Sequence, residues 1–163
     1  MSSTEKIKAV FSCPLGNLQA QFEGEFLTQL VFTDAAAGVE NNDKRIILLK
    51  AELSAYFEGK LKNFSVPIKP KGTEFQEKIW QLLCEIPIGE KRSYTELSES
   101  FGDKKAIRAV ATANGANPIT ILIPCHRVIG SDGNLRGYAW GLDKKRKLLE
   151  LESQHSTAWR LFR

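Results

Sequence analysis

A thiol, an imidazole and a guanidinium follow one another at Cys125, His126 and Arg127. A cysteine becomes a nucleophile when a neighbouring base or cation favours its thiolate form. Pro124 cannot donate a ladder hydrogen bond, so regular structure should stop there and leave the thiol at the mouth of an apolar pocket. The alternative is that Cys125 is simply a small core residue, the usual fate of a cysteine. With Pro124, His126 and Arg127 beside it, we interpret Cys125 as a candidate nucleophile.

The segments on either side of the thiol indicate how it is held. Residues 121–123 are apolar and rich in β-branched side chains, which predicts a short buried strand or extended segment. Residues 114–118 contain Gly, Asn and Pro and break the preceding helix, and residues 130–134 form a loop. A second loop, punctuated by glycines, supplies candidate pocket residues: Tyr138, Ala139 and Trp140.

Composition limits the classes of protein that this chain can belong to. Its 163 residues with 42% hydrophobic content can bury one substantial core or two small ones. The net charge of +4 suits a polyanionic partner but is too mild to prove one. Three spaced cysteines and two histidines fit neither a disulfide framework nor a zinc site. Without a signal segment or a long apolar run, the sequence predicts a reduced, soluble, cytoplasmic protein with no bound metal and no membrane association.

The first part of the chain predicts an antiparallel meander followed by a helix. Apolar and polar residues alternate over residues 7–11, 18–22 and 26–32, with turn residues between these runs. Residues 44–57 then carry apolar side chains at helical spacing. Residues 60–72 contain two prolines and no helical period, so we expect a last extended piece and then a linker. Two domains are predicted, residues 1–72 and residues 73–163.

The second domain is predicted to be mainly helical. Thr73 and Gln76 form a capping box before a helix. Its apolar face is expected to exclude Trp80 and Cys84. That face consists of Phe75, Ile79, Leu82, Leu83 and Ile86.

Two short helices joined by a tight turn come next. Ser93 and Glu96 form a second capping box before a helix over residues 94–101, and Gly102 ends that helix. Asp103 can cap a further helix over residues 106–113. This arrangement predicts a helix-turn-helix, although an ordinary αα-hairpin with solvated lysines has the same pattern.

The second of these helices carries Ala106, Ala109 and Ala113 at positions i, i+3 and i+7. We interpret them as a smooth face that can lie close to the sugar-phosphate wall of a narrow groove. A reader of the major groove would instead present Asn, Gln or Arg to the base edges. A final helix, capped by Asp143 and running from residue 144 to about residue 153, carries Glu152, and residues 154–163 receive no role.

Several of these residues together resemble the O6-alkylguanine-DNA alkyltransferase family. The specific match is Asn117-Pro118 followed by the run from Ile121 to Val128, which contains Pro-Cys-His-Arg. Motifs before and after it agree in order and spacing, and the match covers residues 73–152. These motifs are Ile86-Pro87-Ile88-Gly89, Ser93-Tyr94, Arg108-Ala109-Val110, Gly141-Leu142 and Glu152. The N-terminal part is similar only in architecture.

The resemblance implies an α+β fold, in which a small RNase H-like sheet with a helix precedes a helical domain that carries the cysteine. It implies transfer of an alkyl group from guanine to Cys125 in a flipped-out base, without a cofactor. Arg108 would fill the space that the base leaves, although alone it would be taken for a surface salt-bridge residue. Tyr94 would donate its hydroxyl to the purine, although alone it would be taken for a core aromatic. Ser93 and the alanine face would contact DNA.

The resemblance also assigns the residues around the thiol. His126 would act as its base, through a bridging water because adjacent side chains rarely face each other. Glu152 would orient the imidazole, although alone it is one of many surface glutamates. Asn117 would tie the loop before the thiol, and Arg127 would pair with a carboxylate beneath the site. Trp140 would form a large side wall that admits methyl and small alkyl adducts and slows benzyl adducts.

The expected partner is double-stranded DNA, bound through its minor groove by a monomer and largely without regard to sequence. The thioether product implies a single turnover. Two other functions are considered as alternatives. A non-enzymatic sensor of alkylated DNA shares the helix-turn-helix but lacks the cysteine, and a cysteine hydrolase would turn over many substrates.

Overall fold

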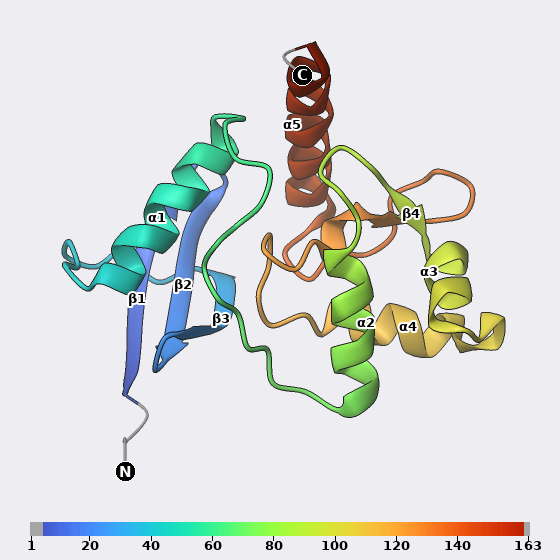
Figure 1. Cartoon of the computed structure of the whole chain (residues 1–163), viewed down its shortest axis with the longest axis horizontal. Helices are drawn as coiled ribbons and strands as arrows, with labels where there is room; N and C mark the ends of the chain where they lie inside the picture. Colours follow the sequence, from blue (N-terminus) through green and yellow to red (C-terminus); the bar gives the residue numbers. More distant parts are fainter. Residues whose placement is uncertain (1–4, 162–163) are drawn as a thin grey trace. The chain divides into compact units, whose positions relative to one another are not determined.

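Three antiparallel strands open the computed structural model, which describes residues 5–161 and the side chains of residues 5–154. They are β1 (Lys6–Cys13), β2 (Gly16–Glu23) and β3 (Phe26–Thr33), paired in that order. Alternating residues point to one face, so Leu18, Ala20 and Phe22 of β2 are buried. The predicted meander is therefore confirmed (Figure 1).

Helix α1 (Lys44–Phe57) lies against this sheet (Figure 1). Asp43 caps it by accepting a hydrogen bond from the Arg45 N–H, which supplies one of the partners that the first turn lacks. The apolar stripe of the helix faces inward, as its spacing predicted. Its buried residues are Ile46, Leu49, Leu53 and Tyr56.

The segment after α1 returns to the sheet edge. Ile68 forms an isolated parallel bridge with Leu27, whose N–H donates to Pro67 and whose carbonyl accepts from Lys69. These bonds cover part of the free edge of β3, which would otherwise present unpaired backbone groups. The last extended piece expected from the sequence is present.

The chain divides into two compact units between Lys71 and Gly72. The second unit is mainly helical, and with the first it confirms the predicted α+β fold class. No helix in the described part of the chain is long and apolar enough to span a membrane. The elements of the second unit are α2 (Glu74–Cys84), β4 (Arg92–Ser93), α3 (Tyr94–Phe101), α4 (Ile107–Gly115), β5 (Val128–Ile129) and α5 (Leu142–Leu161).

Both predicted capping boxes are formed, at the starts of α2 and α3. Helix α3 ends at Gly102, whose φ of 103° lies in the left-handed region that glycine adopts without strain. Asp103 then accepts from the Lys105 N–H at the start of a short 3-10 helix, Lys104–Ala106, which leads into α4. Helices α3 and α4 cross in Figure 1, as a helix-turn-helix requires.

Trp80 corrects the prediction for α2. It was placed off the apolar face, but only 2% of it is exposed, and its indole N–H donates to the Ala113 carbonyl at 2.9 Å. A buried indole needs such an acceptor, and α4 supplies one where it packs against α2. Trp80 therefore joins two helices of the core instead of facing solvent.

The segment before Cys125 corrects a second prediction. Residues 121–123 form a turn and not a strand, with Leu122 N–H donating to Thr120 and Ile123 N–H donating to Ile119. Ile121 has a φ of 72°, a conformation that is strained for a β-branched residue. Its side chain is 1% exposed, so burial holds the strained backbone in place.

Helix α5 differs from its prediction at both ends. It begins at Leu142, so Asp143 lies in the first turn and is not the cap. It continues to Leu161, well beyond the predicted end near residue 153. The residues 154–163 that received no role thus largely extend this helix, as far as the described residues go.

Candidate active site

Cys125 opens a short 3-10 helix, Cys125–Arg127, directly after the turn that contains Ile121. Its N–H donates to the Ile123 carbonyl at 2.8 Å, and the Pro124 carbonyl accepts from the Arg127 N–H at 3.0 Å. The thiol residue is only 6% exposed. Pro124 therefore does end the preceding segment, and a tight helical turn then positions the thiol.

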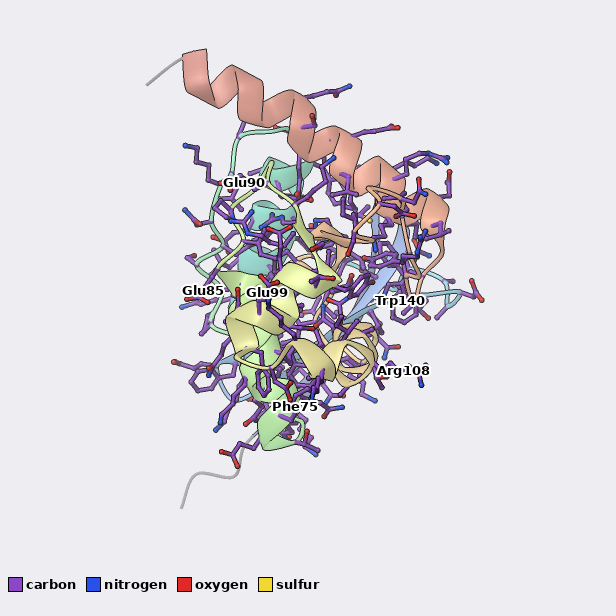
Figure 2. The ribbon with its side chains drawn as sticks, turned by 90° about the vertical axis from the view of Figure 1, so that its right-hand side faces the viewer. Phe75, Glu85, Glu90, Glu99, Arg108 and Trp140 are labelled. Carbon is purple, nitrogen blue, oxygen red and sulfur yellow. The ribbon has the colours of Figure 1, made fainter. Side chains whose placement is uncertain are left out.

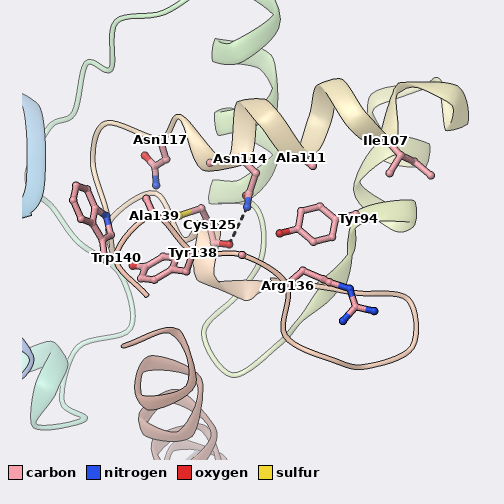
Figure 3. A pocket seen from close by; sticks show the side chains of 12 residues that line it. Tyr94, Ile107, Ala111, Asn114, Asn117, Cys125, Arg136, Tyr138, Ala139 and Trp140 are labelled. Atoms are coloured by element: carbon pink, nitrogen blue, oxygen red, sulfur yellow. Dashed lines mark hydrogen bonds between the residues drawn. The ribbon is translucent and has the colours of Figure 1, made fainter. Parts of the chain in front are cut away.

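A cavity of about 470 Å³ leads to the thiol (Figure 3). This volume lies in the range of sites for small molecules. Every lining residue belongs to the second unit, and aromatic side chains form much of the wall. The lining residues are Tyr94, Ile107, Ala111, Asn114, Gly115, Asn117, Cys125, Arg136, Gly137, Tyr138, Ala139 and Trp140.

The protonation of Cys125 differs from the expectation of a ready thiolate. Burial raises the pKa of the thiol, because a thiolate loses its hydration there. Asn117, Lys145 and the backbone N–H of Cys125 oppose this rise without cancelling it. The thiol is thus protonated at neutral pH, and a reaction at Cys125 requires a base.

A buried ionic network lies next to the thiol. Glu152, on α5, accepts from His126 Nε2 at 2.7 Å and from the Arg127 guanidinium at 2.7 and 3.0 Å. Arg127 also donates to the Ile86 carbonyl at 2.6 Å. Burial opposes the charge on Glu152, but His126 and Arg127 outweigh it and hold the pKa of Glu152 well below its usual range. Arg127 thus pairs with a carboxylate beneath the site, as predicted.

The bond to Glu152 determines which nitrogen of His126 can act as a base. A carboxylate only accepts, so Nε2 carries the hydrogen and Nδ1 of the neutral ring keeps a lone pair. Nδ1 is buried and has no hydrogen-bond partner among the described residues. The imidazole therefore has one nitrogen fixed by Glu152 and one available to accept a proton.

Lys145 is a buried cation that the sequence analysis missed. Its residue is fully buried, its Nζ donates to the carbonyls of Arg136 and Gly137 at 2.6 and 3.2 Å, and it lies 5.9 Å from the centre of the Tyr94 ring. Burial lowers its pKa to about 8, and the Cys125 thiolate would raise it. Lys145 thus ties the pocket loop to α5 and favours the thiolate.

The spacing along α5 contains the signal that would have revealed Lys145. It shares one face with Leu148 and Glu152, at i, i+3 and i+7, and all three are buried. The surrounding run of Lys and Arg residues hides this position, because Arg146 and Lys147 are exposed and Lys144 is only half-buried.

Asn117 and Tyr138 hold the walls of the cavity. The Asn117 amide donates to the Ile123 carbonyl at 2.7 Å and accepts from the Ile119 N–H at 2.9 Å, which fixes the turn before the thiol. The Tyr138 hydroxyl bonds to the Thr120 hydroxyl at 2.6 Å. Trp140, on the same loop as Tyr138, is half-buried at the cavity wall (Figure 3).

Tyr94 is the first residue of α3 and reaches the cavity from the side opposite Trp140 (Figure 3). Its side chain is half-buried. Ser93 caps α3, and its hydroxyl oxygen accepts from the Glu96 N–H at 3.0 Å. The structure thus brings Tyr94 to the thiol, whereas Ser93 serves the start of the helix.

Helix α4 corrects the predicted alanine face. Ala109 and Arg108 are exposed, and Figure 2 shows Arg108 projecting from the ribbon. Ala113 is 2% exposed and its carbonyl accepts from the Trp80 indole, so Ala113 cannot contact DNA. Ala106 is half-buried in the turn before α4. The face towards the cavity is instead formed by Ile107, Ala111, Asn114 and Gly115.

Comparisons with known proteins agree with this geometry. Residues 6–70 match the family model described as the 6-O-methylguanine DNA methyltransferase, ribonuclease-like domain, and residues 74–154 match its DNA binding domain. The methylated-DNA–protein-cysteine methyltransferase of Methanosarcina acetivorans is 44% identical over 88% of this chain and 96% of that protein. That of Methanosarcina barkeri is 57% identical over 64% of this chain and 66% of the relative.

A solved structure extends the similarity to three dimensions. The Mycobacterium tuberculosis OGT crystallised in complex with DNA has a TM-score of 0.82 and 41% identity, over 91% of this chain and 93% of that chain. The two family models together span most of the sequence. With a cavity-lining cysteine and the motifs around it in place, the chain belongs to the 6-O-methylguanine DNA methyltransferase family.

Proposed function

We propose that this protein repairs DNA by moving a methyl or small alkyl group from the O6 oxygen of guanine to its own Cys125, once. The observation that carries the proposal is the position of the thiol. Cys125 lines a cavity of about 470 Å³ and adjoins the buried His126–Glu152 pair. Family membership and the relatives named methylated-DNA–protein-cysteine methyltransferase support the same reaction.

The reaction is a displacement at the alkyl carbon. The thiol proton passes to His126 Nδ1 through a bridging water, which is the path open to a nitrogen without a protein partner. As the S–C bond forms, the C–O6 bond breaks and its electron pair passes to the purine, to which the Tyr94 hydroxyl donates its proton. The His126 imidazolium then gives up its proton, which returns to Tyr94 through water. In sum the alkyl group replaces the thiol hydrogen and guanine regains its ring proton, so no cofactor is consumed.

Glu152 and Arg127 support the base without touching the substrate. The Glu152 carboxylate fixes the His126 tautomer and stabilises the imidazolium that forms. Arg127 holds Glu152 ionised through two hydrogen bonds. A thioether product is stable, and no group beside Cys125 is placed to cleave it, so each molecule reacts a single time.

DNA must present the base outside its stack, because a thiol cannot reach O6 within a duplex. Arg108, exposed on α4, fills the space that the base leaves. Ser93 and Tyr94, at the start of α3, and the small residues Ala106 and Ala109 lie against the backbone of the minor groove. A monomer suffices, and contacts to phosphate and sugar carry little sequence information.

The range of adducts follows from the cavity wall. Trp140 supplies a large rigid side chain, so methyl and other small groups enter more readily than benzyl groups. An alkyl group on O4 of thymine presents similar chemistry on a smaller base, and we include it among the substrates.

Intact-mass measurement with excess duplex that contains O6-methylguanine tests the reaction. The expected result is one added methyl group, mapped to Cys125, with the exposed Cys84 unmodified. Cys125→Ser should gain nothing, and Cys84→Ser, the matched control, should gain one methyl group. Binding without a mass change would support the sensor of alkylated DNA, and repeated release of repaired DNA would support a turnover enzyme.

Arg108→Ala tests base extrusion. Reaction with the free base O6-methylguanine should persist, because the cavity is untouched. Reaction in duplex should fall about a hundredfold, the scale of a few kcal/mol of unstacking. The measurement is the single-turnover rate on both substrates. Equal losses on the two would contradict the role of Arg108 as the filling residue.

A further inference from the structure

The carboxamide of Asn114 lines the cavity between Tyr94 and Cys125 (Figure 3). Asn114 lies near the end of α4 and is 5% exposed. Its amide nitrogen donates to the Cys125 carbonyl at 3.4 Å, which fixes the orientation of the carboxamide. Its Oδ1 atom is buried and has no hydrogen-bond partner among the described residues.

An orphaned acceptor is unfavourable for folding. A buried carbonyl oxygen without a donor costs free energy that an apolar side chain of similar shape would avoid. The single bond from Asn114 to Cys125 is long for a hydrogen bond and offsets little of this cost. We therefore expect the Asn114 side chain to have a role other than stabilising the fold. Its amide nitrogen is the group that can have this role.

The amide nitrogen has two N–H groups, and the bond to Cys125 uses only one of them. Figure 3 shows the Tyr94 hydroxyl pointing towards Asn114. Burial is the largest cause that raises the pKa of Tyr94, and a side-chain hydrogen bond from Asn114 opposes this rise. The second N–H is therefore the group of Asn114 that is free to donate to the Tyr94 oxygen across the cavity.

We propose that Asn114 is a positioning residue that joins the Cys125 carbonyl to the Tyr94 hydroxyl oxygen and so turns the Tyr94 proton towards the bound base. A hydroxyl oxygen that accepts from an amide directs its own hydrogen elsewhere. The same amide sets the distance between the proton donor and the nucleophile. This inference rests on the proposed alkyl transfer, in which Tyr94 is the proton donor.

The other charged groups around Tyr94 cannot take its proton. Lys145 lies 5.9 Å from the ring centre, and Arg136 lines the same cavity. An ammonium and a guanidinium only donate hydrogen bonds, so neither competes with a substrate for the hydroxyl hydrogen. The Cys125 thiol, which lines the same cavity, is a weak acceptor. The proton is thus left for a ring nitrogen of the purine.

Substrate analogues can separate positioning from a structural effect. We would measure single-turnover rates on duplexes with O6-methylguanine and with its 1-deaza and 3-deaza forms, each of which lacks one ring acceptor. Rates would be compared for the wild type, Tyr94→Phe, Asn114→Leu and Asn114→Ala, together with their melting temperatures. Ser98→Ala is the matched control, because it removes a second buried, unpartnered polar atom that does not line the cavity.

One of the two analogues should slow the wild type and leave Tyr94→Phe unchanged, which identifies the nitrogen that Tyr94 serves. On O6-methylguanine, Asn114→Leu should be about tenfold slower than the wild type, the effect of one hydrogen bond. On the analogue that lacks this nitrogen, Asn114→Leu should react at the same rate as the wild type. Asn114→Ala should show the same pattern if the larger Leu does not fit, and Ser98→Ala should react at the wild-type rate on every substrate.

Equal losses for the Asn114 variants on the parent and both analogues would overturn the proposal, because they would indicate a structural effect. A wild-type rate that is indifferent to both analogues would overturn it as well. Failure of the alkyl transfer itself is distinct, because the wild type would then gain no methyl group at Cys125.

Discussion

The sheet of the first unit and the region around Cys125 solve the problem of burial in opposite ways. In the sheet, regular strands place apolar side chains inside, and Glu23 pairs with Lys6 and Lys71, whose side chains are 66% exposed. Around Cys125, charged Glu152, Arg127 and Lys145 are buried together.

Backbone strain and buried polar atoms without a partner also distinguish the two units. The single positive φ of a non-glycine residue in the described part of the chain is at Ile121. Among the described side chains, the buried polar atoms without a partner are in Ser98, Asn114 and His126, all in the second unit. Natural proteins break the rules of stable folding where function requires it. The second unit therefore gives up stability to hold reactive groups.

The largest difference between the two regions is expected when one carboxylate in each is exchanged for an amide. Glu152→Gln leaves buried Arg127 unpaired and should destabilise the second unit by about 3–5 kcal/mol. It should also slow alkyl transfer about a hundredfold or more, because His126 loses its orienting acceptor. Glu23→Gln, the matched change on the sheet, should change both little. Thermal unfolding and single-turnover rates measure the two effects.

The pH dependence of the first pair has a definite sign. Since Arg127 and His126 hold the pKa of Glu152 below its usual value of 4.5, its pairing stabilises the fold above about pH 4.5 and is lost as the pH falls. The gap in melting temperature between wild type and Glu152→Gln should therefore narrow between about pH 5 and about pH 3. A constant gap would contradict the ionised pair.

Leu30→Ala should change the stability of the first unit without changing the rate of alkyl transfer. Leu30 is fully buried in β3, and its truncation should destabilise the first unit by about 2–5 kcal/mol. The transfer rate well below the melting temperature should not change, because every residue that lines the cavity belongs to the second unit. A rate that falls with this variant would show that the two units do not divide stability and chemistry as described.

Lys145→Met should affect the stability of the fold and the rate of alkyl transfer in different ways. Because burial lowers the pKa of Lys145 from 10.5 to about 8, its charge opposes folding below that pH and ceases to do so as the pH rises towards 10.5. Between about pH 8 and pH 10.5, the free energy of unfolding of the wild type should thus increase relative to that of Lys145→Met. The variant should react about tenfold more slowly at neutral pH, because loss of the nearby cation raises the pKa of Cys125 and one nearby charge commonly changes a thiolate fraction about tenfold. An unchanged rate would remove Lys145 from the chemistry.

The smallest effect is expected at the cavity wall. Trp140→Gly should speed reaction with O6-benzylguanine by about threefold to tenfold, since it removes a rigid side wall. The rate with O6-methylguanine should change by less than about twofold. Competition between the two adducts in one sample measures this ratio. A benzyl rate that does not rise would show that Trp140 does not restrict entry.

Structural features that depend on a periodic pattern or on a local cap could be predicted from the sequence. The alternation in the sheet, the stripe of α1 and the capping boxes at Thr73 and Ser93 depend on neighbours in the chain, so the bounds of α1 and α3 match their predictions. Trp80 and Ala113 were misplaced because both are buried where α2 packs against α4. The hydrogen bond that joins them spans 33 positions, and no local pattern contains it.

The residues of the site likewise fall into those with a local signal in the sequence and those without one. Cys125, His126 and Arg127 are adjacent and carry their own signal, and the distant Glu152 was found through the family pattern. Ile121 could not be foreseen as a turn, because a β-branched residue favours a strand unless its surroundings force another conformation. Lys145 is one lysine in a charged run, and only the packing of α5 distinguishes it from its neighbours.

A protein that reacts once is spent by any electrophile that reaches its sulfur. Since Cys125 is 6% exposed and burial raises its pKa, the resting thiol is a poor target for soluble alkylating agents and oxidants. Activation then awaits an occupant of the cavity that brings a reactive carbon against the sulfur. The shielding that makes the nucleophile sluggish also preserves the supply of unreacted protein while the agents that damage DNA are still present.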